Sequence, residues 1–156
     1  MVKFFSSTPV EDIEAINNQA SSILNMETGE LAFSMLMTGF QFKKALMQEH
    51  FNENYVESDK FPKGTFKGKI LNWDKSKLNG NDPTAFDVEG EITIHGVTKP
   101  YKVKSNLIKK GDQIEGDTKF NIKVADHDIK IPSAVVDNIA EEVEVTINIT
   151  YKPYNK

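Results

Sequence analysis

Strict alternation of apolar and polar residues in three long segments constrains the fold more than any other feature of this sequence. Between positions 143 and 151, the residues Val143, Val145, Ile147, Ile149 and Tyr151 alternate with polar or charged residues. The segments 88–94 and 114–124 follow the same period of two. This alternation is typical of antiparallel strands that have one buried face and one solvated face. The sequence therefore predicts an all-β fold.

Additional strands bring the expected number to about eight. We predict them at residues 2–5, 21–26, 30–37, 64–73 and 101–108. Turn residues separate several of these segments, for example Glu27-Thr28-Gly29 and Lys110-Gly111-Asp112. With eight antiparallel strands, a closed barrel is either filled by its own side chains or holds one small ligand.

Three short segments depart from the period of two and are predicted to be helical. In residues 8–20, Thr8 stands at an N-cap position, Pro9 at the first helical position and Glu11 three residues after the cap. Residues 43–53 form the second predicted helix, which ends before Pro62. Residues 133–140 form a third, shorter one.

The composition limits the class of protein and its partners. A length of 156 residues suits one domain, here residues 1–156, and the formal net charge of −4 argues against a nucleic-acid partner. Without cysteine there is no disulfide and no thiolate metal site. No apolar stretch has the length of a transmembrane segment. The start of the chain lacks the apolar region of a signal peptide, so we expect a protein that is either not secreted or already without its leader; the apolar segment from Val2 to Phe5 favours the second.

Histidines are the main candidates for catalysis or metal binding. Asp126-His127-Asp128 is interpreted as a solvated turn, with a weak cation site as the alternative. His50 could act as an acid–base group with Glu49 or Glu53, but the spacing favours a histidine on a helix surface. We therefore predict no catalytic residue and no metal ligand.

Aromatic and methionine side chains are concentrated between positions 33 and 66. Methionine adapts its shape and is common in sites for flexible apolar ligands, but the same residues also fill ordinary cores. The composition leaves both interpretations open. The residues concerned are Phe33, Met35, Met37, Phe40, Phe42, Leu46, Met47, Phe51, Phe61 and Phe66.

Two separated blocks carry a resemblance to a known family. In residues 48–66, a short helix containing His50 is followed by an acidic and aromatic segment, then by Phe61-Pro62 and Phe66. In residues 88–100, a strand containing Gly90 leads into Gly96-Val97-Thr98-Lys99. With the strand 143–151, these blocks resemble the YceI-like family over about residues 30–152.

The resemblance implies an extended antiparallel eight-stranded lipocalin-like barrel with one to three short helices. It implies a non-enzymatic bacterial protein of the periplasm, or a secreted one, that binds polyisoprenoids, isoprenoid quinones or fatty-acid derivatives. It implies no cofactor other than such a bound lipid, and leaves a homodimer open. The family's Arg-Asx-Phe-Gly segment is replaced by residues 125–129, so no head-group role is carried over from that Arg. The predicted lining residues of the lipid cavity are Phe33, Met35, Phe42, Leu46, Phe66, Ile70, Ile92, Ile94, Phe120, Ile122, Val145 and Ile147.

Physical chemistry supports binding without strong polar contacts. Burying one isoprene unit removes about 100 Å² of apolar surface, which is worth about 2–3 kcal/mol. A site built in this way leaves no catalytic motif in the sequence. Two alternatives remain: a filled barrel that acts through its surface, and a small hydrolase or isomerase that uses His50 or His127 with neighbouring carboxylates.

Overall fold

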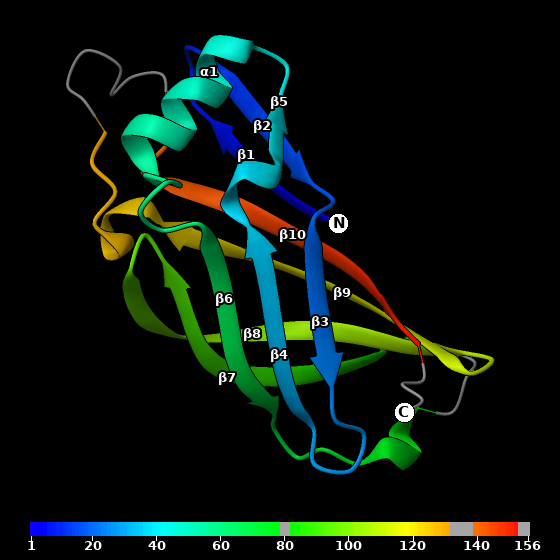
Figure 1. Cartoon of the computed structure of the whole chain (residues 1–156). Helices are drawn as coiled ribbons and strands as arrows, with labels where there is room; N and C mark the ends of the chain where they lie inside the picture. Colours follow the sequence, from blue (N-terminus) through cyan, green and yellow to red (C-terminus); the bar gives the residue numbers. More distant parts are fainter. Residues whose placement is uncertain (79–81, 132–138, 153–156) are drawn as a thin grey trace.

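The fold is a single curled antiparallel sheet with one short α-helix over one end (Figure 1). The computed structural model describes residues 1–78, 82–131 and 139–152. Ten strands lie in this part of the chain: β1 (Val2–Ser7), β2 (Asp12–Asn17), β3 (Ala20–Leu24), β4 (Glu30–Leu36), β5 (Phe40–Phe42), β6 (Lys63–Ile70), β7 (Thr84–Ile94), β8 (Val97–Lys110), β9 (Gln113–Lys123) and β10 (Glu142–Tyr151). The helical elements described are α1 (Ala45–His50), the π-helix η2 (Phe51–Tyr55), and the 3-10 turns η1 (Met37–Gly39), η3 (Lys75–Lys77) and η4 (Val124–His127).

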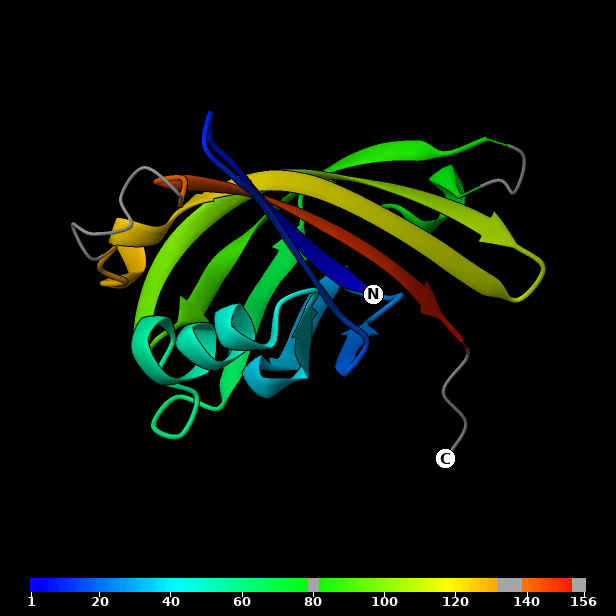
Figure 2. The ribbon, with the colours of Figure 1, turned by 90° about the horizontal axis from the view of Figure 1, so that it is seen from above.

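Two bends allow ten strands to form an eight-stranded barrel. The hydrogen-bonded order is β3-β4-β6-β7-β8-β9-β10-β1-β2-β5. Because β3 continues β2 and β5 continues β4, the two ends of this order belong to the same bent hairpin, and the sheet curls round to meet itself (Figure 2). The predicted class, an all-β antiparallel barrel with a short helix, is confirmed; the strand count differs because each half of the bent hairpin is a separate strand.

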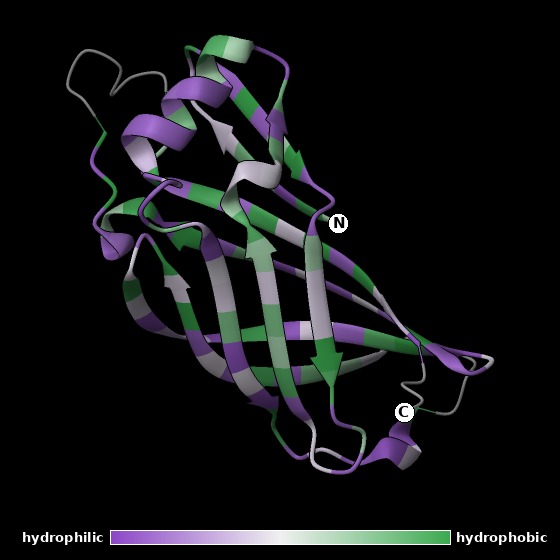
Figure 3. Ribbon diagram, in the orientation of Figure 1, coloured by the Kyte–Doolittle hydropathy of each residue, from purple (hydrophilic) through white to green (hydrophobic). Residues whose placement is uncertain are grey.

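Alternation along strands such as β2 separates a buried interior from a solvated exterior. Figure 3 shows the corresponding bands of hydrophilic and less hydrophilic residues along β6. The interior contains two apolar clusters. One, which includes Val2, Phe40 and Val145, lies at the end of the sheet near α1; the other, which includes Ile70, Phe86 and Leu107, lies at the far end. Since buried apolar area is the main favourable term in folding, this pattern fixes which face of the sheet curls inward.

The predicted helix over residues 8–20 is wrong. Its proposed cap does form a local bond, because the Glu11 backbone N–H donates to Thr8 Oγ1 at 3.0 Å, but this bond closes a turn between β1 and β2. In β2, Ile13, Ala15 and Asn17 are buried in strict alternation. Pairing with β1 therefore overrides the helical signal, which was local to the turn.

Of the other two predicted helices, one is present and the other lies mostly outside the described residues. The helix predicted at residues 43–53 is present as α1 followed by η2. Of the helix predicted at residues 133–140, positions 133–138 lie outside the described residues. Among the described residues, no helix combines the length and apolar character needed to cross a membrane.

A two-residue turn connects β7 to β8. His95 and Gly96 have φ values of 57° and 72°, as required when both central residues of a hairpin turn are left-handed. This turn directs the His95 side chain toward the loop after η2, where it joins the site described below.

Candidate functional site

An elongated apolar cavity runs through the barrel between the two clusters. It measures about 210 Å³ and is lined by side chains from all ten strands and from α1 and η2. Protein interiors are close-packed, and a designed cavity of about 150 Å³ already binds benzene-sized molecules. The cavity is therefore large enough to take an apolar ligand, and the interior of this barrel is hollow.

Eleven of the twelve predicted lining residues border this cavity. They come from β4, β5, β6, β7, β9 and β10, which bring side chains distant in the sequence to one space. These residues are Phe33, Met35, Phe42, Phe66, Ile70, Ile92, Ile94, Phe120, Ile122, Val145 and Ile147. Their predicted role in binding lipid remains a prediction.

Leu46, the twelfth predicted lining residue, does not line the cavity. It lies on α1 with 63% of its surface exposed and does not border the cavity, whereas the next residue, Met47, does. Successive residues on a helix point about 100° apart, so a helical phase error of one residue exchanges an inward position for an outward one.

Sequence reasoning missed the contribution of the first three strands to the cavity. Val2, Phe4 and Ile13 from β1 and β2 border the cavity, as do Ser22 and Leu24 from β3. The alternation of β2 was available in the sequence but was interpreted as a helix. The prediction that Val2 begins a strand was correct, but nothing in it indicated that the strand faces a cavity.

A cluster of four phenylalanines covers the cavity near α1. Phe4, Phe40, Phe42 and Phe51 form this aromatic cluster, with ring centroids 5.1–5.6 Å apart. Tilted and edge-to-face arrangements such as these add packing energy beyond burial alone. The aromatic cluster makes this end of the cavity strongly apolar.

A polar network ties the same end of the barrel together. We call Glu57, His95, His127 and Tyr101 the His95 network. His127 Nδ1 lies 3.0 Å from the Val97 carbonyl oxygen, and its Nε2 lies 3.0 Å from the Tyr101 hydroxyl. A carbonyl only accepts, so Nδ1 carries the hydrogen and Nε2 accepts from Tyr101. Burial raises the pKa of Tyr101, so its hydroxyl stays protonated and is able to donate this hydrogen bond.

His95 connects three segments of the chain within this network. Its Nδ1 contacts the His127 carbonyl oxygen at 3.1 Å, and its Nε2 contacts a Glu57 carboxylate oxygen at 2.8 Å. The His127 carbonyl oxygen and the Glu57 carboxylate are both hydrogen-bond acceptors, so His95 supplies the donor in each contact. The bond from His95, followed in importance by that from Lys60, lowers the pKa of Glu57. Glu57, His95 and Asp128 are three non-glycine residues with positive φ, so backbone strain also accumulates here.

The interpretation of Asp126-His127-Asp128 as a solvated turn is wrong for its histidine. His127 is fully buried and borders the cavity, although Asp126 and Asp128 are exposed. Its partners Val97 and Tyr101 lie on β8, far away in the sequence. Within the described residues, no group of three or more His, Asp or Glu side chains is arranged to hold a metal ion.

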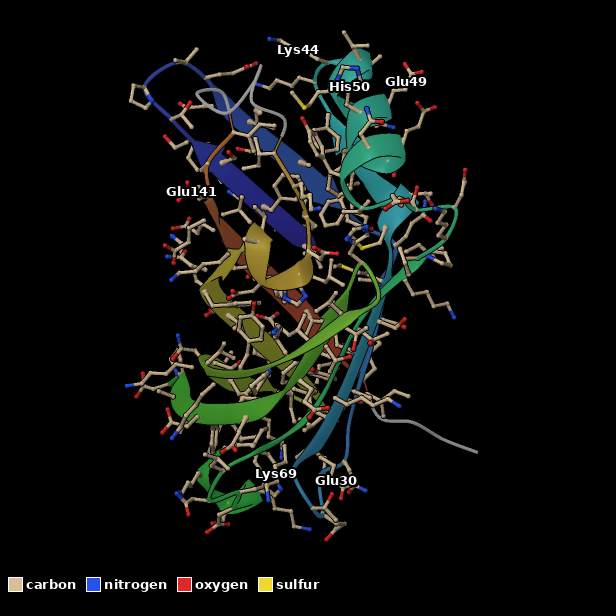
Figure 4. All side chains as sticks on the ribbon, turned by 90° about the vertical axis from the view of Figure 1, so that its left-hand side faces the viewer. Glu30, Lys44, Glu49, His50, Lys69 and Glu141 are labelled. Carbon is tan, nitrogen blue, oxygen red and sulfur yellow. The ribbon has the colours of Figure 1, made fainter. Side chains whose placement is uncertain are left out.

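His50 lies outside the cavity. It is on α1 at the end of the molecule, beside Glu49 (Figure 4). In the part of the chain that the structure describes, neither Glu49 nor Glu53 forms a hydrogen bond with it. The proposed acid–base pair is therefore not assembled in this structure.

Acid should weaken the His95 network through Glu57. The pKa of Glu57 is lower in the folded state, so its carboxylate stabilises the fold above the ordinary pKa range of a Glu and loses that contribution as the pH falls through the lowered pKa. We expect Glu57→Gln to make the urea midpoint fall less steeply from neutral to acidic pH. Glu53→Gln, which changes an exposed acid on η2, serves as the control. Superimposable pH profiles for Glu57→Gln and the unaltered protein would contradict this role.

Comparisons with known proteins agree with the geometry. The model of the YceI-like domain family matches residues 5–151. The protein YceI of an Escherichia coli strain is 28% identical over 102 residues, which cover 62% of this chain and 48% of that protein. The chain thus matches about half the length of such curated relatives.

Solved structures show the same fold. A polyisoprenoid-binding domain from Saccharophagus degradans superposes with a TM-score of 0.82 at 16% identity, covering 98% of this chain and 93% of that one. BcnA from Burkholderia cenocepacia has a TM-score of 0.81 at 16% identity, with 97% and 95% covered. The YceI protein of Campylobacter jejuni has a TM-score of 0.71 at 14% identity, with 90% and 85% covered.

Proposed function

The chain belongs to the YceI-like domain family, and from this premise we propose that it binds one long-chain amphiphilic lipid, an isoprenoid, an isoprenoid quinone or a fatty-acid derivative, inside the barrel. The observation that carries the proposal is the continuous apolar cavity through the interior. The polyisoprenoid-binding domain of Saccharophagus degradans, which has the same fold, supports this choice of ligand class.

The energetics favour a long apolar tail. Each buried isoprene unit contributes about 2–3 kcal/mol, so several units together exceed the cost of immobilising one ligand without a strong polar contact. The cavity lining is almost entirely aliphatic and aromatic, as such a tail requires.

We further propose that the protein carries this lipid through an aqueous compartment, or stores it there. The compartment is the bacterial periplasm or the outside of the cell. A barrel that hides the tail of a lipid removes the free-energy penalty of that tail in water. This role requires binding and release rather than chemistry, and we place the protein among binding proteins rather than enzymes. The disposition of His50 and His127 supports this, since His127 has both nitrogens in hydrogen bonds and His50 lies outside the cavity.

A filled barrel that acts through its surface is the second candidate from the sequence. No specific observation favours it, because a solid interior would leave no room for the cavity described above.

Gentle purification followed by native mass spectrometry should show one lipid-sized mass per chain. We expect the delipidated protein to take up geranylgeraniol, a quinone with an isoprenoid tail, or oleyl alcohol at a ratio near one to one. Heat-unfolded protein exposed to the same lipids gives the background. A delipidated, folded protein that refuses isoprenoids, quinones and fatty-acid derivatives alike would overturn the proposed function.

A further inference from the structure

The cavity lining lacks the side chains that would neutralise an ionic head group. Among the described residues that border the cavity, none is an Asp, Glu, Lys or Arg. His127 is the one imidazole among them, and both of its nitrogens already have partners. A carboxylate or diphosphate taken from water into such an interior loses its hydration without gaining a counter-charge, which costs several kcal/mol.

Uncharged polar groups do reach the cavity, and one pair lies on strands β3 and β10. The hydroxyls of Ser22 and Tyr151 are 2.8 Å apart, and both residues border the cavity. Ser22 Oγ also donates to the Ala32 carbonyl oxygen at 3.1 Å. A serine has one hydroxyl hydrogen, so Tyr151 donates to Ser22 and keeps its own lone pairs for another donor. By turning its O–H, Tyr151 can instead donate to a ligand carbonyl, and the number of hydrogen bonds stays the same.

This pair lies where the barrel wall is least tightly joined. Asn148 exchanges two backbone hydrogen bonds with Met1, at 2.7 and 2.9 Å. After that point β10 pairs with β9 on one side and faces β3 on the other. No backbone hydrogen bond between β3 and β10 is present in the described parts of these strands, so the Ser22–Tyr151 bond crosses an open seam. The side chains of β3 and β10 can therefore move apart here without breaking backbone hydrogen bonds between strands.

The two ends of the cavity therefore differ in chemistry. Near α1, the aromatic cluster presents rings and the polar atoms of His127 are saturated. Tyr55 on η2 also borders the cavity at this end and is the alternative partner that the variants below test. At the seam, the hydroxyls of Ser22 and Tyr151 can exchange a bond with a ligand. Burial raises the pKa of Tyr151, so this group remains a neutral phenol and offers no charge of its own.

We propose that the ligand has an uncharged, hydrogen-bonding head group, an alcohol, carbonyl or amide, which lies against Ser22 and Tyr151 at the β3–β10 seam, with its tail directed toward the aromatic cluster. This inference rests on the proposed function and narrows its substrate class. It excludes free fatty acids and isoprenoid diphosphates as preferred ligands.

Pairs of ligands with the same tail and different heads test the inference. Geranylgeraniol is compared with geranylgeranyl diphosphate, and oleyl alcohol with oleate, by competition against a fluorescent lipid on delipidated protein. We expect each alcohol to bind at least about tenfold more tightly than its ionic counterpart, since about 1.4 kcal/mol corresponds to a factor of ten. Equal or tighter binding of the ionic ligands overturns this inference and leaves the proposed function standing. Failure of these four ligands and of a quinone with an isoprenoid tail to bind overturns the proposed function itself.

Conservative variants test the position of the head group. Tyr151→Phe should weaken geranylgeraniol binding about 3–10-fold, the range for loss of one hydrogen bond, and leave the diphosphate unchanged. Ser22→Ala should act in the same direction, whereas Ser21→Ala, on the exposed face of the same strand, should have no effect. If Tyr55→Phe weakens alcohol binding and Tyr151→Phe does not, the head group lies near α1 and the seam assignment is wrong.

Discussion

Phe66→Asp should abolish lipid loading and lower the free energy of unfolding by about 4 kcal/mol or more. Phe66 borders the cavity and packs against both apolar clusters, so its ring joins the two halves of the interior. The ring also covers the paired glycines Gly68 and Gly90 of β6 and β7, since a Cβ atom built on either would approach its Cζ to 2.9 or 2.7 Å. Loss of a fully buried Phe side chain costs about 3–5 kcal/mol, and Phe66, which is partly buried, falls at the lower end of that range. A carboxylate at the same place adds a desolvation cost and repels an apolar tail.

Urea unfolding and a fluorescent-lipid titration measure the two effects of this change. Ile94→Asp, at a second lining position that is 8% exposed, should also abolish loading. Phe66→Asn separates the effect of charge from that of shape, because Asn has the size of Asp without its charge. We expect this variant to bind more lipid than Phe66→Asp does. Ala32→Asp is the matched control, since Ala32 is exposed on β4 and pairs with Lys67, which a new carboxylate would attract. If Phe66→Asp folds, as judged by circular dichroism, and still binds lipid with unchanged affinity, the cavity is not the binding site.

Strands with long runs of alternation were predictable because their pattern is local. The segment 143–151 was predicted as a strand and forms most of β10 (Glu142–Tyr151). Inward residues on such strands follow from the period of two once the buried face is known, which explains why Val145 and Ile147 were placed toward the interior. Composition alone left open whether the barrel is filled by its own side chains or encloses a ligand. The resemblance to the YceI-like family is what led us to predict a hollow barrel.

Features that depend on contacts between distant residues were not predictable from the sequence. The capping residues at Thr8 form a turn, and pairing with β1 makes the segment after that turn a strand rather than a helix. His127 is buried because Val97 and Tyr101 on another strand supply its partners. Ser22 and Tyr151 are 129 positions apart, and their hydroxyls meet because the sheet curls until β3 faces β10. No local pattern marks a serine that lies at a seam.

The bends of the hairpin formed by β2–β3 and β4–β5 make Asn17 a buried polar residue whose loss should strongly destabilise the barrel. Asn17 ends β2, has no exposed surface and pairs with Phe40 of β5. Its Nδ2 donates to the Leu36 carbonyl oxygen and its Oδ1 accepts from the Gln19 backbone N–H, both at 2.7 Å. One side chain thus supplies the backbone partners that are lost where β2 turns into β3 and β4 turns into β5.

Asn17→Ala should lower the free energy of unfolding by about 2–4 kcal/mol, because it leaves a buried donor and a buried acceptor without partners. Urea unfolding monitored by the fluorescence of Trp73 measures the change, with Asn18→Ala, at the exposed neighbouring position, as the control. Asn17→Asp keeps the oxygen that accepts from the Gln19 N–H but replaces the Nδ2 donor by a second oxygen. That oxygen then faces the Leu36 carbonyl oxygen, and the two acceptors repel each other. Protonation would turn that oxygen into a donor, so the folded state should raise the pKa of the new carboxyl, and the variant should lose stability as the pH rises through this value. Two results would contradict this role: an Asn17→Ala variant as stable as Asn18→Ala, or an Asn17→Asp variant whose stability equals that of the unaltered protein at every pH. Either result would show that the two bends form without this side chain and that apolar packing alone shapes the hairpin.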